Sequence, residues 1–168
     1  MLEAPLTIYT IGHSDHDTVA FVDLLRQHKI AVVVDVRSRP YSQWTPQFNR
    51  EILARDLAES DADIAYRFMG DLLGGQPFDP ALYPPDHERP DYRRVEQTSA
   101  YQTGIARLLD LARAGRVAVM CSEGDHRRCH RHLLIAQTLL ARGVRVLHIQ
   151  PDGGTVEGEL IPRQLSLF

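Results

Sequence analysis

The chain has 168 residues, 43% hydrophobic and 24% charged, a composition that excludes wholesale disorder and favours one domain with a single core. The formal net charge of −3 at pH 7 excludes a polycation that coats nucleic acid. No apolar run reaches the roughly 20 residues of a membrane span, the N-terminus lacks a signal-peptide pattern, and two cysteines are too few for a disulfide scaffold. We therefore expect a cytoplasmic protein without membrane contact.

Short apolar runs alternate along the chain with amphipathic stretches, as strands do with helices. The first run ends at Gly12-His13-Ser14, and Ser14 with Asp17 resembles a capping box for an amphipathic helix that includes residues 19–25. The expected strands are 6–11, 31–36, 64–68, 116–120 and 144–149, and the further expected helices are 49–57, 99–114 and 128–141.

Residues 70–98 interrupt this alternation with Gly74-Gly75 and five prolines, which predicts an irregular insertion. The remaining pattern predicts a mainly parallel sheet with helices on both faces. We therefore expect a single compact Rossmann-like α/β domain over 1–150, followed by a linker and tail over 151–168.

Ligands of such sheets bind beyond the carboxyl ends of the strands, at the switch in strand order. With the common order 3-2-1-4-5, the first and fourth strands are neighbours at that switch. The loops that begin at Gly12, Asp35 and Cys121 then converge on one cleft.

The loop at Asp35 carries candidate chemistry because a carboxylate at the end of an apolar strand is costly unless it is paired or used. Arg37 and Arg39 follow it and are suited either to pair with Asp35 or to clamp a substrate phosphate. Both interpretations stay open at this point. Tyr41, Trp44 and Phe48 follow, and are suited to stack on bases or to pack the loop onto the domain.

The loop at Cys121 is rich in titratable groups and precedes an expected helix, which predicts an anion site. Cys121 and Arg127 have the Cys-x5-Arg spacing of cysteine phosphatases and some rhodanese-like loops, but Glu123 and Asp125 would repel a phosphate dianion. Glu123 is expected to face Asp35 across the cleft, so that two carboxylates divide acid and base roles. His13 is expected to assist them.

The cysteines Cys121 and Cys129 allow several interpretations. Together with His126 and His130 they include zinc-ligand types, but their spacing lacks a paired knuckle. Packing residues and a regulatory disulfide are the alternatives. We expect no cofactor, and a divalent metal stays open.

Five motifs occur in an order and spacing that resemble the domain-of-unknown-function family 488, a family of uncharacterised bacterial and archaeal proteins. The resemblance covers residues 6–150 and implies a compact α/β domain whose site is built from these motifs, without implying a reaction. The motifs are Thr10-Ile11-Gly12-His13-Ser14, Asp35-Val36-Arg37-Ser38, Pro46-Gln47-Phe48, Leu73-Gly74-Gly75 and Cys121-x-Glu123…Cys129-His130-Arg131.

The last five residues resemble the pentapeptide by which bacterial polymerases and repair proteins bind the DNA sliding clamp. They are Gln164-Leu165-Ser166-Leu167-Phe168, and they follow a stretch rich in glycine and proline. An extended tail of this kind places Leu167 and Phe168 in an apolar pocket while Gln164 forms a hydrogen bond beside it. The alternative is a terminal segment that packs on its own domain.

These observations together predict a DNA-maintenance enzyme that the sliding clamp recruits, and that hydrolyses a glycosidic or phosphoester bond in a nucleotide or a DNA lesion. One alternative is a phosphatase-like or sulfurtransferase-like enzyme that uses Cys121, and another is a non-catalytic adaptor that binds a nucleotide or DNA. The expected catalytic residues are Asp35, Glu123, His13 and Cys121. The expected substrate-binding residues are Ser14, Arg37, Ser38, Arg39, Gly74, Gly75, Arg128, His130 and Arg131.

Overall fold

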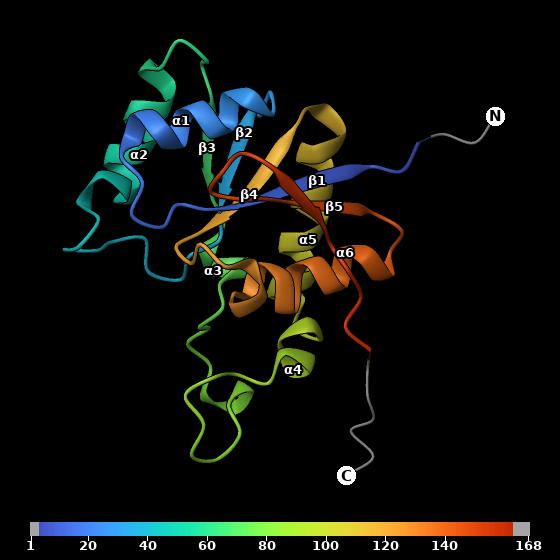
Figure 1. The fold of residues 1–168 in the computed structure, drawn as a ribbon. Coiled ribbons are helices and arrows are strands. Elements are labelled where there is room, and N and C mark those ends of the chain that lie inside the picture. The colour runs from blue at the N-terminus through green and yellow to red at the C-terminus, as the bar shows by residue number, and fades with distance from the viewer. Residues whose placement is uncertain (1–3, 163–168) are drawn as a thin grey trace.

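Six strands form one sheet in the computed structural model, which describes residues 4–162 (Figure 1). Five of them are parallel, and the last runs antiparallel along the edge beside its predecessor. The strands are β1 (Thr7–Gly12), β2 (Val32–Asp35), β3 (Ala65–Phe68), β4 (Val117–Cys121), β5 (Arg145–Ile149) and β6 (Thr155–Glu157). The expected α/β fold with a mainly parallel sheet is confirmed.

The strand order is β3-β2-β4-β1-β5-β6, so the expected order 3-2-1-4-5 is wrong. β4 lies between β1 and β2, where it pairs Gly12 with Cys121 and Asp35 with Met120. The expected contact between the first and fourth strands is present. The carboxyl ends of β2, β4 and β1 are therefore three consecutive neighbours, which brings their loops together.

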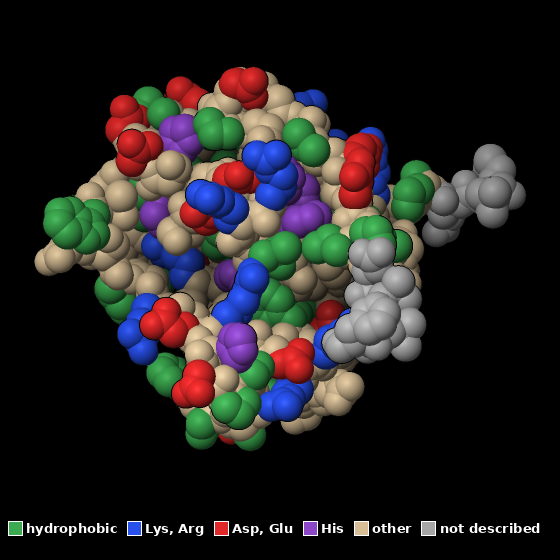
Figure 2. All heavy atoms as spheres, turned by 60° about the horizontal axis from the view of Figure 1, so that its bottom comes forward, with side chains coloured by type: hydrophobic (Ala, Val, Ile, Leu, Met, Phe, Trp, Pro, Cys, Tyr) green, Lys and Arg blue, Asp and Glu red, His purple; other side chains and the backbone are tan. Residues whose placement is uncertain are grey.

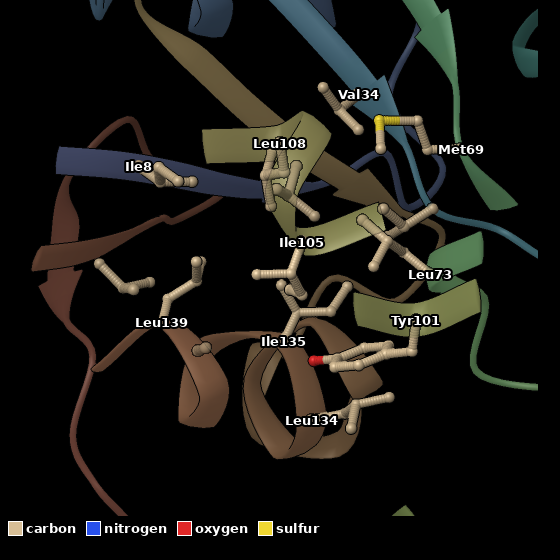
Figure 3. Close-up of a cluster of buried hydrophobic side chains, with 14 of the residues drawn as sticks. Ile8, Val34, Met69, Leu73, Tyr101, Ile105, Leu108, Leu134, Ile135 and Leu139 are labelled. Carbon is tan, nitrogen blue, oxygen red and sulfur yellow. The ribbon is translucent and has the colours of Figure 1, made fainter. Parts of the chain in front are cut away.

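Helices cover both faces because alternate residues of the buried strands point to opposite sides of the sheet. α1 (Thr18–Gln27) and α2 (Arg50–Glu59) bury Phe21, Leu25, Leu53 and Leu57 on one face. The other face packs against α5 (Ser99–Ala114), the π-helical segment Arg131–Ala136 and α6 (Gln137–Ala141). In Figure 3, Ile105 and Leu108 of α5 lie between the strand residues Ile8 and Val34 and the residues Leu134, Ile135 and Leu139.

The first helix begins differently from the sequence expectation. Asp17, not Ser14, is its N-cap residue, because the Asp17 side chain accepts a hydrogen bond of 2.7 Å from the backbone N–H of Ala20. Ser14 instead adopts a left-handed backbone conformation with φ of 47°. It turns the chain between β1 and α1.

Two further segments differ from expectation. The expected helix 128–141 consists of a 3-10 turn at His126–Arg128, the π-helical segment and α6. The expected linker begins with the β5–β6 hairpin, so ordered pairing with the sheet continues to Glu157.

The insertion over 70–98 has local structure of its own. It contains α3 (Gly70–Leu73) and α4 (Tyr92–Glu96) with a 3-10 turn at Pro80–Leu82 between them. Leu82 and Val95 anchor it because both are buried in the core cluster beneath α5.

Candidate functional site

A cleft of about 410 Å³ opens where β1, β2 and β4 end, and Figure 2 shows basic side chains around a hollow on this side of the molecule. The cleft brings together most of the residues that the sequence nominated. These are His13, Arg37, Ser38, Arg39, Gly75, Cys121, Glu123, Arg128 and His130. Asp35, Ser14, Gly74 and Arg131 lie behind or beside this lining.

Asp35 is fully buried below the cleft floor and pairs with Arg37. Its carboxylate accepts hydrogen bonds of 2.9 and 2.8 Å from Arg37 Nε and Nη2, and one from the hydroxyl of Tyr66. Arg37 Nη2 also donates to the carbonyl of Phe48 at 2.7 Å. Of the two interpretations left open for Arg37, the structure shows the pairing, and the Asp35 oxygens face Arg37 and Tyr66 rather than the cleft.

His13 lies beside this pair at the cleft wall. Its Nδ1 is 2.8 Å from the carbonyl of Ser14, and Arg37 Nη1 is 3.2 Å from its Nε2. Burial, followed by the nearby Arg37 charge, lowers the pKa of His13 to about 4. A neutral ring that donates from Nδ1 to Ser14 and accepts from Arg37 at Nε2 satisfies both contacts. His13 therefore orients Arg37.

Arg131 is the largest fully buried side chain among residues 4–162, and its guanidinium contacts Cys121. Its Nε is 3.2 Å from Cys121 Sγ, and its Nη2 donates to the carbonyls of Glu123 and Gly124 at 2.9 and 3.2 Å. Burial lowers the pKa of Arg131 to about 10, so the group is a cation at pH 7. None of these acceptors is a carboxylate, so the sulfur of Cys121 borders a buried positive charge.

Thr10 and His148 hold Arg131 in place. Arg131 Nη1 donates to Thr10 Oγ1 at 2.7 Å, and His148 Nδ1 is 2.6 Å from the same oxygen. Burial lowers the pKa of His148 to about 2, so its ring is neutral and Nδ1 accepts the Thr10 proton. This chain of hydrogen bonds fixes the guanidinium without neutralising it.

The sulfur atoms of Cys121 and Cys129 are in contact as a disulfide pair at the edge of the cleft. Their Cα atoms are 7.6 Å apart, beyond the roughly 4.4–6.8 Å usual for disulfides. The backbone N–H of Arg131 lies 3.5 Å from Cys129 Sγ. The two cysteines, joined as a disulfide, therefore line the same cleft as Arg37, Arg39 and Arg128.

The loop after β4 does not form the phosphatase arrangement suggested by the Cys-x5-Arg spacing. Arg127 is exposed and forms an ion pair with Asp125 at 3.0 Å, outside the cleft lining. Glu123 turns back so that its Oε1 accepts a hydrogen bond of 3.1 Å from the Asp125 backbone N–H. The cation nearest to Cys121 is consequently Arg131, ten residues along the chain.

Two of the nominated arginines remain available to a ligand. Arg39 and Arg128 are exposed at the cleft, and within residues 4–162 neither side chain forms a hydrogen bond or an ion pair. They flank the cleft from the loops after β2 and β4.

Close packing also explains two glycines in the nominated motifs. A Cβ atom at Gly12 would lie 1.9 Å from the carbonyl oxygen of Glu123, so only glycine allows β1 to approach the Cys121 loop. At Gly75 it would lie 2.8 Å from the ring of His130, whose Nε2 is 3.0 Å from the carbonyl of Val36. Both glycines bring backbone segments together at the cleft.

A comparison with models of protein families matches residues 17–138 to the family described as domain of unknown function DUF488. The chain belongs to the DUF488 family. The resemblance found in the motifs is thereby confirmed. Neither the search of curated proteins nor that of solved structures found a match to the chain.

The matched part of the DUF488 chain contains the loops of Asp35 and Cys121, whereas Gly12-His13-Ser14 precedes it. All three loops meet in the structure. Among residues 4–162, no three or more His, Cys, Asp and Glu side chains are arranged to hold a metal ion. In the same part of the chain, no helix combines the length and apolar character that crossing a bilayer requires.

Sequence reasoning missed two residues of the candidate site, Tyr66 and His148, and it included Thr10 in a motif without giving it a role. The signal for His148 was a single histidine within an apolar strand, and Thr10 likewise lies within the first apolar run. Tyr66 carried no comparable signal because its contact with Asp35 depends on strand pairing. The nominated residues Gln164, Leu165, Leu167 and Phe168 lie outside the described part of the chain.

Proposed function

We propose that this protein is a thiol-dependent hydrolase that acts on a phosphate-bearing substrate, a nucleotide or DNA, with Cys121 as the nucleophile. One observation carries the proposal: the buried guanidinium of Arg131 donates from Nε to Cys121 Sγ at 3.2 Å. A cation next to a cysteine favours the thiolate, which is the nucleophilic form. Cys121 also lines the cleft, as a nucleophile must.

The proposal takes up the alternative in which Cys121 is the nucleophile, in place of the expected acid–base pair of Asp35 and Glu123. Asp35 is buried and its oxygens are occupied by Arg37 and Tyr66, so it positions Arg37 rather than contacting substrate. Glu123 remains at the cleft with Cys121.

The residues of the cleft divide the reaction into two steps. The thiolate of Cys121 attacks the electrophilic centre, and the bond to the leaving group breaks as the bond to sulfur forms. The leaving group departs as an anion. The carboxylate of Glu123 then takes a proton from a water molecule, whose oxygen attacks the same centre and releases the thiolate, and Glu123 afterwards loses that proton to solvent. Arg39 and Arg128, which are exposed and unpaired within residues 4–162, bind the substrate phosphates.

The proposal requires the reduced state, because a Cys121 sulfur bonded to Cys129 cannot attack a substrate. With only two cysteines in the chain, Cys129→Ser leaves Cys121 as the single thiol. In this variant, mass spectrometry measures the rate at which iodoacetamide alkylates Cys121 at each pH. We expect the midpoint of this pH profile to lie below about 8.5, the value typical of a free cysteine. Thr10→Val, which removes one support of Arg131, should raise the midpoint.

Activity is then screened on nucleoside phosphates, abasic oligonucleotides and 5′-phosphorylated oligonucleotides with dithiothreitol present. We expect turnover that Cys121→Ser abolishes and that Cys129→Ser retains. An ordinary alkylation midpoint, or turnover unchanged by Cys121→Ser, would refute the nucleophilic role. Binding without turnover in every arm would favour the non-catalytic adaptor.

Recruitment by the DNA sliding clamp is a second proposal, and it depends on the sequence of the tail alone. All five residues from Gln164 to Phe168 agree with the clamp-binding pentapeptide. Such a tail would bring an acidic protein to DNA that its net charge of −3 does not attract.

A further inference from the structure

The cleft continues beyond the thiol in two directions. A second hollow of about 510 Å³ shares Gly75, Gln76, Tyr92 and Arg128 with the cleft. A third hollow of about 500 Å³ shares Arg39 and Gln76 with it. Pockets for one small molecule span about 300–1,000 Å³, and the three connected hollows together exceed that range. The groove is therefore longer than a mononucleotide requires.

Two aromatic rings project into solvent beside this groove. Trp44 is 84% exposed and lies between Ser42 and Thr45, which both line the cleft. Phe78 is also 84% exposed and lines the third hollow together with Arg39. Among residues 4–162 these two side chains are the most exposed large hydrophobic ones, and both lie next to the groove, so their rings are accessible for stacking.

The loop that presents Trp44 is held by hydrogen bonds, so the ring's exposure is built into the fold. The Ser42 hydroxyl accepts hydrogen bonds from the backbone N–H groups of Trp44 and Thr45, at 3.0 and 3.3 Å. The Ser42 N–H donates to Asn49 Oδ1 at 2.7 Å, which ties the loop to the start of α2. The same loop therefore fixes both the ring and the cleft wall.

We propose that this groove binds single-stranded DNA, with phosphates on Arg39 and Arg128 and unpaired bases on Trp44 and Phe78. Arginines that lack partners within residues 4–162 match phosphates in charge, and exposed rings match the faces of bases. Bases within a duplex are already stacked on both faces, which favours a single strand over a double helix. The inference rests on the proposed function in taking the cleft as the substrate site, and it narrows the substrate from nucleotide or DNA to an unpaired strand.

The test is a binding titration of the full chain with 5′-fluorescein-labelled dT12, followed by fluorescence anisotropy. Because Trp44 is the only tryptophan, unlabelled dT12 should also quench the intrinsic tryptophan emission. We expect dT12 to bind at least tenfold more tightly than dTMP and than a blunt hairpin duplex. Each of Trp44→Ala and Phe78→Ala should weaken binding about fivefold or more, the lower end of base–aromatic stacking.

Matched controls separate binding at the groove from the effect of removing any exposed apolar side chain. Val19 is 71% exposed on α1 and lines none of the three hollows, so Val19→Ala should bind dT12 as the wild type does. For single strands the slope of log K against log salt is about −0.7 per phosphate contact. Arg39→Gln and Arg128→Gln should each reduce that slope by about this amount.

The outcomes also distinguish this inference from the proposed hydrolase. Anisotropy reports binding of dT12 without any turnover, so a protein that lacks thiol activity can still show the single-stranded DNA site. Failure of dT12 to bind, equal binding of dTMP, or tighter binding of the duplex or of rU12 would overturn the single-stranded DNA site, even if thiol turnover were found. Self-association that depends on Trp44 would overturn it in favour of a protein interface.

Discussion

The pair of Asp35 and Arg37 allows a prediction whose magnitude follows from its burial. Asp35→Asn removes the negative charge while Arg37, which is 7% exposed, keeps its guanidinium in the same place. The Asp35 carboxylate accepts from the N–H, Nε and Nη2 of Arg37 at 3.1, 2.9 and 2.8 Å, and it also accepts from Tyr66. Removing one partner of a buried pair costs about 3–5 kcal/mol, because the other charge stays buried.

This loss is large enough to measure directly. A chain of this size loses about 2–4 °C of melting temperature per kcal/mol, so Asp35→Asn should lower Tm by about 6–20 °C. Urea unfolding followed by far-ultraviolet circular dichroism gives the free energy itself. The matched control is Asp110→Asn, because Asp110 pairs with Arg113 at 2.9 Å in an exposed ion pair, and such pairs contribute about 1 kcal/mol or less.

Two results would refute this reasoning. A loss of less than about 1 kcal/mol for Asp35→Asn, similar to the control, would show that water screens the pair. A variant of unchanged stability that nevertheless lacked turnover would return Asp35 to the acid–base role that the sequence suggested.

Three other predictions follow from the site and the tail. The lowered pKa of His13, about 4 against 6.5 in the unfolded chain, means that the unfolded chain binds more protons between these values. Stability should therefore fall as pH drops from 6.5 to 4, and His13→Asn should flatten this part of a urea-midpoint profile; an unchanged profile would contradict the burial of the ring. Gly12→Ala should destabilise the fold by at least about 3 kcal/mol in the same urea assay, because its Cβ would lie 1.9 Å from the Glu123 carbonyl oxygen. This loss is at or above the upper end of the usual cost of overpacking. The control Gly115→Ala, whose Cβ would have its nearest neighbour at 3.6 Å, should cost less than about 1 kcal/mol. A chain ending at Arg163 should lose binding to a bacterial sliding clamp in surface plasmon resonance, and equal binding by both lengths would remove the clamp proposal.

Local patterns in the sequence predicted elements better than their arrangement. The helix expected over 99–114 has these bounds in α5, because Thr98 caps it through its side chain and apolar residues recur on one face. The strand order was not predictable from the same patterns, because every buried parallel strand is a similar apolar run and pairing is non-local. Asp17 rather than Ser14 is the cap for a related reason: both are good capping residues, but the backbone N–H of Ser14 donates to the carbonyl of Ser122 at 2.9 Å, a non-local contact.

The sequence predicted which residues lie at the candidate site better than it predicted what each residue does there. The three loops converge because β1, β2 and β4 are consecutive neighbours in the observed strand order, as they also are in the expected one, which is why most nominated residues line one cleft. Roles depend on burial, and the sequence did not show that Asp35 and Arg131 lie below the surface. Arg131, nominated for phosphate, contacts Cys121 and Thr10 instead.

The position of β4 between β1 and β2 constrains the order in which a growing chain can assemble. β1 and β2 do not pair with each other, and the strand that joins them spans residues 117–121. When about 110 residues have been synthesised, β2 and β3 are the only neighbouring strands of this sheet that can pair. β1 cannot pair with its neighbours until β4 and β5 have been synthesised. Such long-range pairing slows folding and leaves strand edges open to other chains during synthesis. The cleft that holds Cys121 is consequently among the last features of the molecule to form.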